Sequence, residues 1–341
     1  MSSTSPPPST SSPPSRLSLI KKANRRRVLT TILSILDRYF SPPFPKSPRF
    51  EISIPSKVSI NHKAPILPRP VLLTFHGGGF SIGDARDDAR WVSTVLKSHP
   101  DAVVVSVNYR LAPEHPFPVA LDDGVDAILW LWRHADQYNL DKTRFVISGF
   151  SAGGNLALAL PFRLHVELQR QRWTGLEKIE LAGLIAFYPS VDWTRTRAER
   201  DATNPIAAKK SMISPSMYRF FDESYLFFAG LPRQRGREGV DMAHPYLSPG
   251  LATDALLLAA YPAAVAIYTC GWDQLLVEGN AFRERLEKVI GVGKMGKVGG
   301  VVIEDVVHGF DKKPSFLKGN EARRKMYGDA VRQLEGMWEV G

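Results

Sequence analysis

A serine inside a glycine-flanked pentapeptide is the residue of this chain with the clearest chemical potential. The sequence GFSAG at 149–153 follows the strand-like run 144–148 and precedes the helix-like run 154–160. A serine on a sharp strand-to-helix turn projects its hydroxyl away from the backbone, and the flanking glycines relieve the crowding in such a turn. The pattern therefore predicts that Ser151 is a nucleophile.

A run of glycines upstream has the composition of an anion-binding loop. The sequence HGGGF at 76–80 directly follows the apolar run 71–75. Successive glycines let backbone N–H groups point into a cavity without side chains in the way, which a developing oxyanion requires. A plain flexible loop is the alternative, but no Ser/Asn-rich linker composition surrounds these glycines.

An activated serine also needs a base and a group that orients the base. His308 follows the strand-like run 301–307 and begins the turn HGF at 308–310. Catalytic groups gather where the strands of a parallel sheet end, which favours His308 as the base. The histidines outside these two segments lie in polar loop, helix-surface or pre-proline contexts that are typical of structural roles.

The same reasoning selects the acid. Asp273 comes just after the apolar run 264–270, whereas Asp305 lies inside the end of the last strand-like run and Glu278 lies further along. We prefer Asp273 and keep Asp305 and Glu278 as competitors. Ser151, Asp273 and His308 then occur in the chain order nucleophile, acid, histidine, which is the order of an α/β-hydrolase.

Taken together, these motifs resemble those of the hormone-sensitive-lipase-type carboxylesterases (α/β-hydrolase fold-3), which include arylacetamide deacetylase-like enzymes. The resemblance covers about 70–310 and implies an α/β-hydrolase fold with a helical cap and hydrolysis of carboxylic esters. The segments that carry it are HGGG at 76–79, YRLAPEHPFP at 109–118, DD at 122–123, GFSAGG at 149–154 and HGF at 308–310.

The resemblance also implies roles for single residues. By the family pattern Ser151 is the nucleophile, Asp273 the acid and His308 the base, and the oxyanion hole consists of the N–H groups of Gly78, Gly79 and Ala152. Two positions depart from the pattern. The residue before the nucleophile is often Asp and is Phe150 here, and the acid motif, commonly Asp-Pro-Leu, reads DQL at 273–275.

Apolar residues close to these motifs and in the cap segment predict the walls of a substrate pocket. We expect short- to medium-chain acyl esters of hydrophobic small molecules as substrates, with water as the acyl acceptor. Amide, lactone or thioester hydrolysis on the same triad is an alternative, as is a non-catalytic receptor like the plant gibberellin receptors, which lack the triad histidine. The expected walls are Phe80, Phe150, Trp272, Leu275, Phe220 and Tyr225.

No cofactor or metal is expected, since no His/Cys/carboxylate cluster has the spacing of metal ligands. Strand-like and helix-like runs alternate along the chain, which predicts an α/β fold with a mostly parallel sheet and helices on both faces. Pro161 predicts a kink or an early stop in its helix. Strands are expected near 49–54, 57–60, 71–75, 102–108, 144–148, 181–187, 264–269 and 299–306, and helices near 84–98, 119–136, 152–171, 279–290 and 320–338.

The domain organisation follows from breaks in this alternation. Residues 1–15 are rich in Ser, Thr and Pro and predict a disordered tail. Residues 16–45 predict N-terminal cap helices broken by a basic patch, and 191–239, where the alternation is lost, predict a cap insertion. Residues 46–190 and 240–341 then form the hydrolase core.

The net charge of +10 is concentrated near the N-terminus, where six basic residues precede the first acidic residue, Asp37. The rest carries only +4, and no stripe of interleaved basic and aromatic residues predicts nucleic-acid binding.

The single cysteine, Cys270, permits no intrachain disulfide, so we expect a cytoplasmic protein. A mitochondrial presequence or a membrane-surface helix are alternatives for the basic segment. The longest uncharged run, 255–271, contains Pro262 and is interpreted as a strand with its preceding loop. Oligomeric state is left open.

Overall fold

A parallel sheet forms the centre of the computed structural model, which describes residues 14–40, 67–170, 179–211, 213–227, 240–313 and 320–339. Its strand order is β2-β1-β3-β4-β5-β6, and β7 also pairs with β5. Every pairing between these strands is parallel. The strands are β1 Arg69–Phe75, β2 Val103–Val107, β3 Leu140–Phe150, β4 Gly183–Phe187, β5 Ala264–Trp272, β6 Lys297–Gly299 and β7 Val302–Val307.

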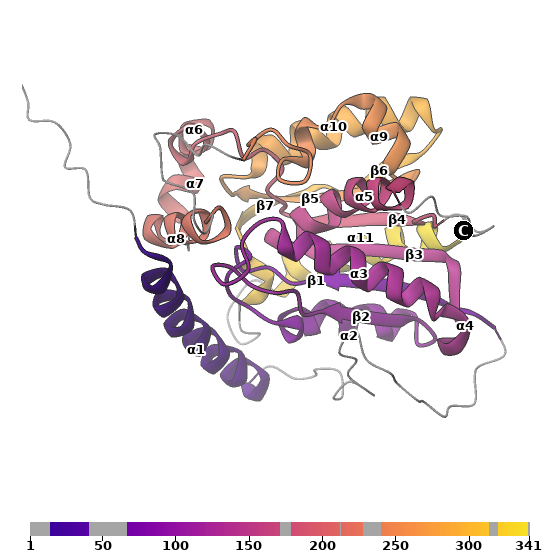
Figure 1. The fold of residues 1–341 in the computed structure, drawn as a ribbon, viewed down its shortest axis with the longest axis horizontal. Coiled ribbons are helices and arrows are strands. Elements are labelled where there is room, and N and C mark those ends of the chain that lie inside the picture. Colours follow the sequence, from indigo (N-terminus) through magenta and orange to yellow (C-terminus); the bar gives the residue numbers. More distant parts are fainter. Residues whose placement is uncertain are drawn as a thin grey trace, which may run out of the picture.

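Helices cover both faces of the sheet, as the alternation predicted (Figure 1). Successive residues of a strand point to opposite faces, so Val71 and Leu73 join one core cluster and Leu72 joins the other. The first cluster includes residues of α3 (Val119–Arg133), α5 (Ala152–Arg170), α9 (Asp254–Ala260) and α10 (Leu276–Gly293), and the second those of α2 (Ala89–Ser98) and α11 (Asn320–Glu339).

Several expected elements differ in detail. The strand expected over 299–306 is divided into β6 and β7 at Gly300, whose φ is 92° and whose Cβ would lie 2.1 Å from the Ile267 carbonyl oxygen. Pro161 does not stop α5, which continues to Arg170. The region before β5, expected to be a loop, contains α9, whose N-terminus is capped by the Thr253 side chain. The remaining short elements are η1 Ala85–Asp88, α4 Ala135–Tyr138, η2 Pro249–Leu251 and η3 Phe310–Lys312.

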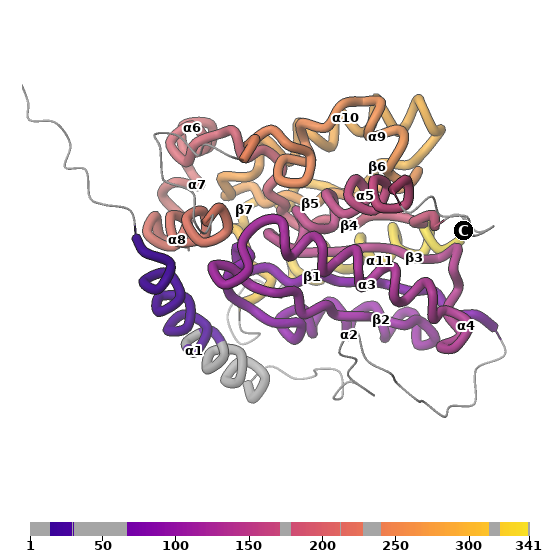
Figure 2. Tube along the Cα trace, in the orientation of Figure 1, coloured from indigo at the N-terminus to yellow at the C-terminus, as the bar shows by residue number. Residues whose placement is uncertain are grey.

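Three short helices lie between β4 and β5, where the chain leaves the sheet before returning through α9 (Figure 2). They are α6 (Arg197–Thr203), α7 (Pro205–Lys210) and α8 (Pro215–Tyr225), and we call them the cap helices. Side chains of Thr196, Asn204 and Ser214 accept hydrogen bonds from the first turns of α6, α7 and α8. Each helix therefore has its own N-terminal cap, and proline begins the latter two.

The N-terminal helix α1 (Arg16–Phe40) lies beside α8 (Figure 1). It is continuous, so the break expected at the basic patch is absent. Leu19 and Ala23 are buried against Phe220 and Phe221 of α8. The predictions for 1–13, 41–45 and the strands at 49–54 and 57–60 fall outside the described residues. No helix in the described ranges has the length and hydropathy needed to cross a bilayer.

Candidate active site

Ser151 stands on a tight turn between β3 and α5, with a φ of 56°. A Cβ on Gly149 would lie 2.0 Å from the Gly153 carbonyl oxygen, and one on Gly153 would lie 1.9 Å from the Phe75 carbonyl oxygen. Backbones this close exclude any other residue type at the two positions. The glycines of the pentapeptide thus let the strand, the turn and the helix pack closely enough to hold Ser151 in a left-handed conformation.

The structure brings Ser151, His308 and Asp273 into one hydrogen-bonded chain. The Ser151 Oγ lies 2.8 Å from His308 Nε2, and His308 Nδ1 lies 2.6 Å from Asp273 Oδ2. The Asp273 side chain is buried, and its Oδ1 accepts a hydrogen bond from the Leu275 N–H at 3.1 Å. In this arrangement the hydroxyl can pass its proton to Nε2 while the carboxylate keeps the other ring nitrogen protonated.

The two competing carboxylates lie elsewhere. Asp305 has an exposed side chain on β7, and Glu278 forms a buried ion pair with Arg200 of α6. Among the described residues, Asp273 is the carboxylate recorded in contact with the His308 ring. The geometry thus separates the three carboxylates that the sequence left open.

The glycine loop lies next to the nucleophile. A Cβ on Gly77 would be 3.4 Å from the Ser151 Cβ, and Gly78 and Gly79 have positive φ values of 107° and 57°. Within the described residues no acceptor is recorded for the N–H groups of Gly78 and Gly79. The N–H of Ala152, at the start of α5, has no intrahelical acceptor either. These amides are free to meet a ligand oxygen, and their role as the oxyanion hole stays a prediction.

Residues of the 109–118 motif support this loop. The His76 and Tyr109 rings stack with centroids 4.3 Å apart, and the Tyr109 hydroxyl donates to the His76 carbonyl oxygen at 2.8 Å. Burial raises the pKa of Tyr109 well above its ordinary value, so the hydroxyl stays a donor. The glycine loop is therefore held by its neighbours and does not behave as a plain linker.

The expected pocket walls are dispersed. Phe80 stacks on Tyr225, with ring centroids 3.7 Å apart. Leu275, the last residue of the DQL motif, is buried. The Lys210 ammonium lies over the Trp272 ring, 3.1 Å from the ring centroid. The part these four side chains take in substrate binding stays a prediction.

Phe150 and Phe220 are placed differently from the expectation. Phe150 stacks on Phe187 at 4.3 Å in the second core cluster, so it is no pocket wall here. The cause is strand alternation, because the residue before the nucleophile points to the opposite sheet face. Phe220 packs on α1, where the Arg26 guanidinium lies 4.3 Å from its ring. The ring against the glycine loop is instead Phe221, which a Cβ on Gly79 would approach to 2.2 Å.

A buried polar network next to His308 was not anticipated from the sequence. The Tyr188 ring meets the His308 ring edge-on at 4.8 Å, and its hydroxyl donates to Asp311 Oδ1 at 2.5 Å. The Tyr327 hydroxyl of α11 donates to Asp311 Oδ2 at 2.6 Å. The Lys312 ammonium lies 2.8 Å from Asp88 Oδ1 and 3.4 Å from Asp311 Oδ2. We call Asp88, Tyr188, Asp311, Lys312 and Tyr327 the base network.

Charges in the base network shift its pKa values in different directions. Burial alone would raise the pKa of Asp311, but the Lys312 ammonium and the two tyrosine hydroxyls hold it below the ordinary value. Burial raises the pKa of Asp88, and Lys312 offsets this only in part. The only sequence signal for this network is a charged DK pair directly after the HGF turn, which by itself resembles a solvated loop.

Comparisons with known proteins agree with this architecture. A family model described as alpha/beta hydrolase fold matches residues 72–312. Esterase LipI of Mycobacterium tuberculosis is 33% identical over 221 residues, which span 64% of this chain and 59% of that protein. Human arylacetamide deacetylase-like 2 is 29% identical over 321 residues, with 81% and 77% covered.

Solved structures give the same picture. An α/β-hydrolase from the metagenome of Lake Arreo, Spain, superposes with a TM-score of 0.67 at 26% identity, covering 94% of this chain and 96% of that one. The Pyrobaculum calidifontis esterase superposes with a TM-score of 0.70 at 23% identity, covering 92% and 93%, and supports the fold alone. The match spans just over half the length of the first two curated relatives. The family model covers more than two thirds of the length of this chain. The chain therefore belongs to the α/β-hydrolase fold-3 family, the hormone-sensitive-lipase-type group.

Proposed function

We propose that this protein is a serine carboxylesterase. The observation that carries the proposal is the continuous chain of hydrogen bonds from Ser151 Oγ through His308 to Asp273, located beside the free amides of the glycine loop. The names of the relatives, which include esterases and a deacetylase-like protein, support ester bonds as the target.

The reaction proceeds in two acyl transfers. His308 Nε2 takes the Ser151 proton as Oγ attacks the ester carbonyl carbon, and the amides of Gly78, Gly79 and Ala152 bind the oxyanion that forms. The imidazolium then gives its proton to the departing alcohol, and the acyl group stays on Ser151. Water repeats the sequence with His308 as base, releasing the acid and the free serine. Asp273 holds the imidazole in the required tautomer throughout.

A fluorophosphonate probe tests the mechanism without knowledge of the natural substrate. We expect the probe to label the wild-type protein at Ser151, located by peptide mass mapping, and to leave Ser151→Ala unlabelled. A folded wild-type protein that resists labelling would favour the receptor alternative. His308 is in place within hydrogen-bonding distance, so no observation at the site favours that alternative.

The substrate class is a finer part of the same proposal. The cap helices bring Phe221 onto the glycine loop, which favours a small enclosed acyl site and short- to medium-chain esters. Each buried methylene contributes about 0.8 kcal/mol, roughly four-fold in kcat/KM, until the chain meets the cap. We therefore expect kcat/KM for p-nitrophenyl esters to rise and then fall between acetate and palmitate. A maximum at palmitate would contradict this, and faster cleavage of matched amides, lactones or thioesters would reassign the bond type.

A further inference from the structure

Besides Lys210 on the Trp272 ring, three residues of the cap helices form hydrogen bonds to the segment that carries the acid, among the residues that the structure describes. Arg200, Asp201 and Asn204, which lie along α6 and its junction with α7, each bind a residue between Gly271 and Glu278. The Gln274 side-chain amide donates to the Asp201 carboxylate. The cap helices are thus fastened to the loop in which Asp273 lies.

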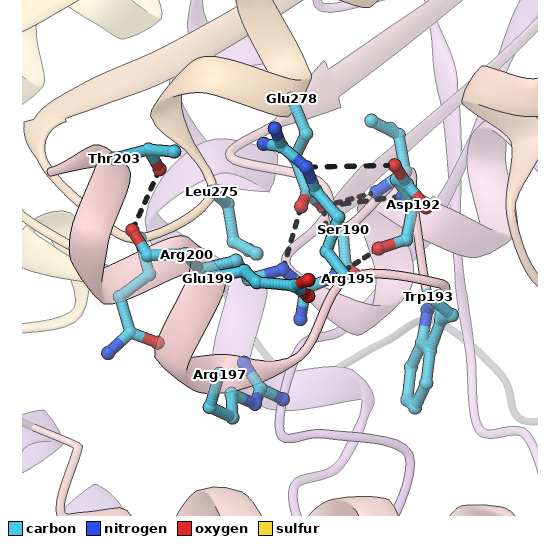
Figure 3. A network of polar contacts seen from close by, with 12 residues as sticks. Ser190, Asp192, Trp193, Arg195, Arg197, Glu199, Arg200, Thr203, Leu275 and Glu278 are labelled. Atoms are coloured by element: carbon cyan, nitrogen blue, oxygen red, sulfur yellow. Dashed lines mark hydrogen bonds and ion pairs between the residues drawn. The ribbon is translucent and has the colours of Figure 1, made fainter.

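The first contact is a buried ion pair that also joins a third segment (Figure 3). Arg200 Nε donates to Glu278 Oε2 at 2.7 Å, and both side chains are at most 3% exposed. Glu278 Oε1 accepts the N–H groups of Val191 at 2.9 Å and Asp192 at 3.3 Å. Arg200 also donates to the Asp192 carbonyl oxygen. Because both charges have several partners, the pair fixes the middle of α6 against the first turn of α10.

The second contact reaches the acid itself. Asn204 is buried, and its Nδ2 donates to the carbonyl oxygens of Gly271 and Asp273, both at 3.0 Å. Its Oδ1 accepts the Ala207 N–H at 3.2 Å and so caps α7. One amide group therefore caps the beginning of a cap helix and holds the backbone on both sides of Trp272, at Gly271 and at Asp273.

We propose that Asn204 is a positioning residue for Asp273 and that the Arg200–Glu278 pair anchors it. The inference rests on the proposed function, because it gives Asp273 the role of triad acid. Hydrogen bonds to two carbonyls flanking Trp272 set where the Asp273 Cα lies, and thereby set the carboxylate against His308. The cap insertion then takes part in catalysis through the acid, in addition to covering the site.

The size of the effect follows from how sharply such geometry matters. A displacement of about 1 Å in a catalytic constellation costs on the order of 100-fold in rate. A carboxylate that moves away from the imidazole also stabilises the protonated ring less, which moves the acid limb of the rate profile to lower pH. Among the described residues, three ionisable groups near the His308–Asp273 pair are Tyr188, which faces the His308 ring, and Tyr218 and Cys270, which lie near Asp273. Burial raises the pKa of all three, that of Tyr218 to about 12, so they stay neutral in the range tested.

The test is Asn204→Ser, which keeps an N-cap oxygen for α7 and removes the donors to the two carbonyls. The readout is the rate of fluorophosphonate labelling against pH, with each preparation normalised to its final labelled fraction so that misfolded protein does not count. We expect a rate about 10- to 100-fold lower at neutral pH and an acid limb displaced to lower pH.

The matched control is Asp222→Asn. It breaks the Arg197–Asp222 ion pair inside the cap helices, at 2.8 Å, without touching the acid loop, and we expect a wild-type rate and pH profile. Asn204→Ser with a wild-type profile, or with a slower rate and an undisplaced acid limb, would overturn the inference. If Asn204→Ser folds poorly, Glu278→Gln, which weakens the anchor, must displace the acid limb in the same direction. An unlabelled wild-type protein would instead overturn the proposed function.

Discussion

The base and the acid that we propose for Ser151 are held by different parts of the molecule. His308 is followed by the base network, which ties its loop to Tyr188 after β4, to Asp88 before α2 and to Tyr327 of α11. Asp273 is held by the cap helices, through the hydrogen bond that the Asn204 side chain donates to its carbonyl oxygen. The base thus depends on the sheet core, and the acid depends on the insertion.

This difference predicts that substitutions around the base and around the acid affect different quantities, the free energy of unfolding and the reaction rate. The carboxylates of the base network are almost completely buried among core elements, so removing one partner leaves an uncompensated charge and lowers the free energy of unfolding. The cap contacts act on the position of one carboxylate. We therefore expect substitutions on the base side to act mainly on stability, and those on the acid side to act mainly on rate.

The largest effect is expected at the nucleophile and the base themselves, which take part in the reaction directly. Ser151→Ala and His308→Ala should each lower kcat for p-nitrophenyl acetate by roughly four to six orders of magnitude, since triad members act as a unit. The double variant should be no slower than either single variant. Additive losses would show that the serine and the histidine work independently.

The acid comes next. Asp273→Asn should lower kcat by about four orders of magnitude, because the amide favours the wrong imidazole tautomer. Asp305→Asn, on the exposed part of β7, is the matched control and should leave kcat within about two-fold. A crippled Asp305→Asn together with a mild Asp273→Asn would reverse the assignment of the acid.

Lys312→Met tests the base side. The Asp88 and Asp311 side chains are at most 1% exposed, whereas Lys312 keeps 30%, so we expect a loss near 3 kcal/mol at pH 7, the lower end for a broken buried pair. Without the ammonium, burial raises the folded-state pKa of Asp88 further above the unfolded value, and Asp311 loses the largest of the influences that hold its pKa down. The ionised carboxylates then destabilise the fold, and they cease to do so once they are protonated.

The deficit of Lys312→Met should therefore shrink as the pH falls toward about 4. Urea unfolding midpoints at pH 7 and pH 4.5 measure it, with Lys97→Met on the surface of α2 as control. An equal deficit at both pH values would mean that Lys312 does not neutralise these carboxylates in the folded protein.

The sequence predicted what depends on local patterning. Apolar runs predicted β1 and β3. The backbone approaches Gly149 and Gly153 so closely that only glycine fits at these two positions, and for this reason the GFSAG motif can be recognised in the sequence. The sheet topology and the match to the family model confirm the fold class and the family predicted from these patterns. Asn204 and Asp311 escaped notice because each has a partner far away in the chain, Gly271 at 67 residues from Asn204 and Tyr188 at 123 residues from Asp311, and a lone Asn or Asp has no periodicity. The prediction that Phe150 lines the pocket was wrong. It relied on the position of Phe150 next to Ser151 in the sequence and neglected the rule that successive strand residues point to opposite faces of the sheet.

The smallest effect should come from Tyr327→Phe on α11, and it sharpens the comparison most directly. The change removes one hydrogen bond to Asp311 Oδ2, at 2.6 Å, and keeps the ring that packs edge-on against Phe150. A hydrogen bond to a charged group contributes about 1.5–3 kcal/mol, so the urea midpoint should fall accordingly.

In Tyr327→Phe, Asp311 keeps its contacts with Tyr188 and Lys312, and the His308 loop should keep its place. Labelling by the fluorophosphonate probe should therefore retain the wild-type rate and pH profile, in contrast to Asn204→Ser. An acid limb displaced as far in Tyr327→Phe as in Asn204→Ser would show that both sides set the geometry of the pair, and the division between core-held base and cap-held acid would fail.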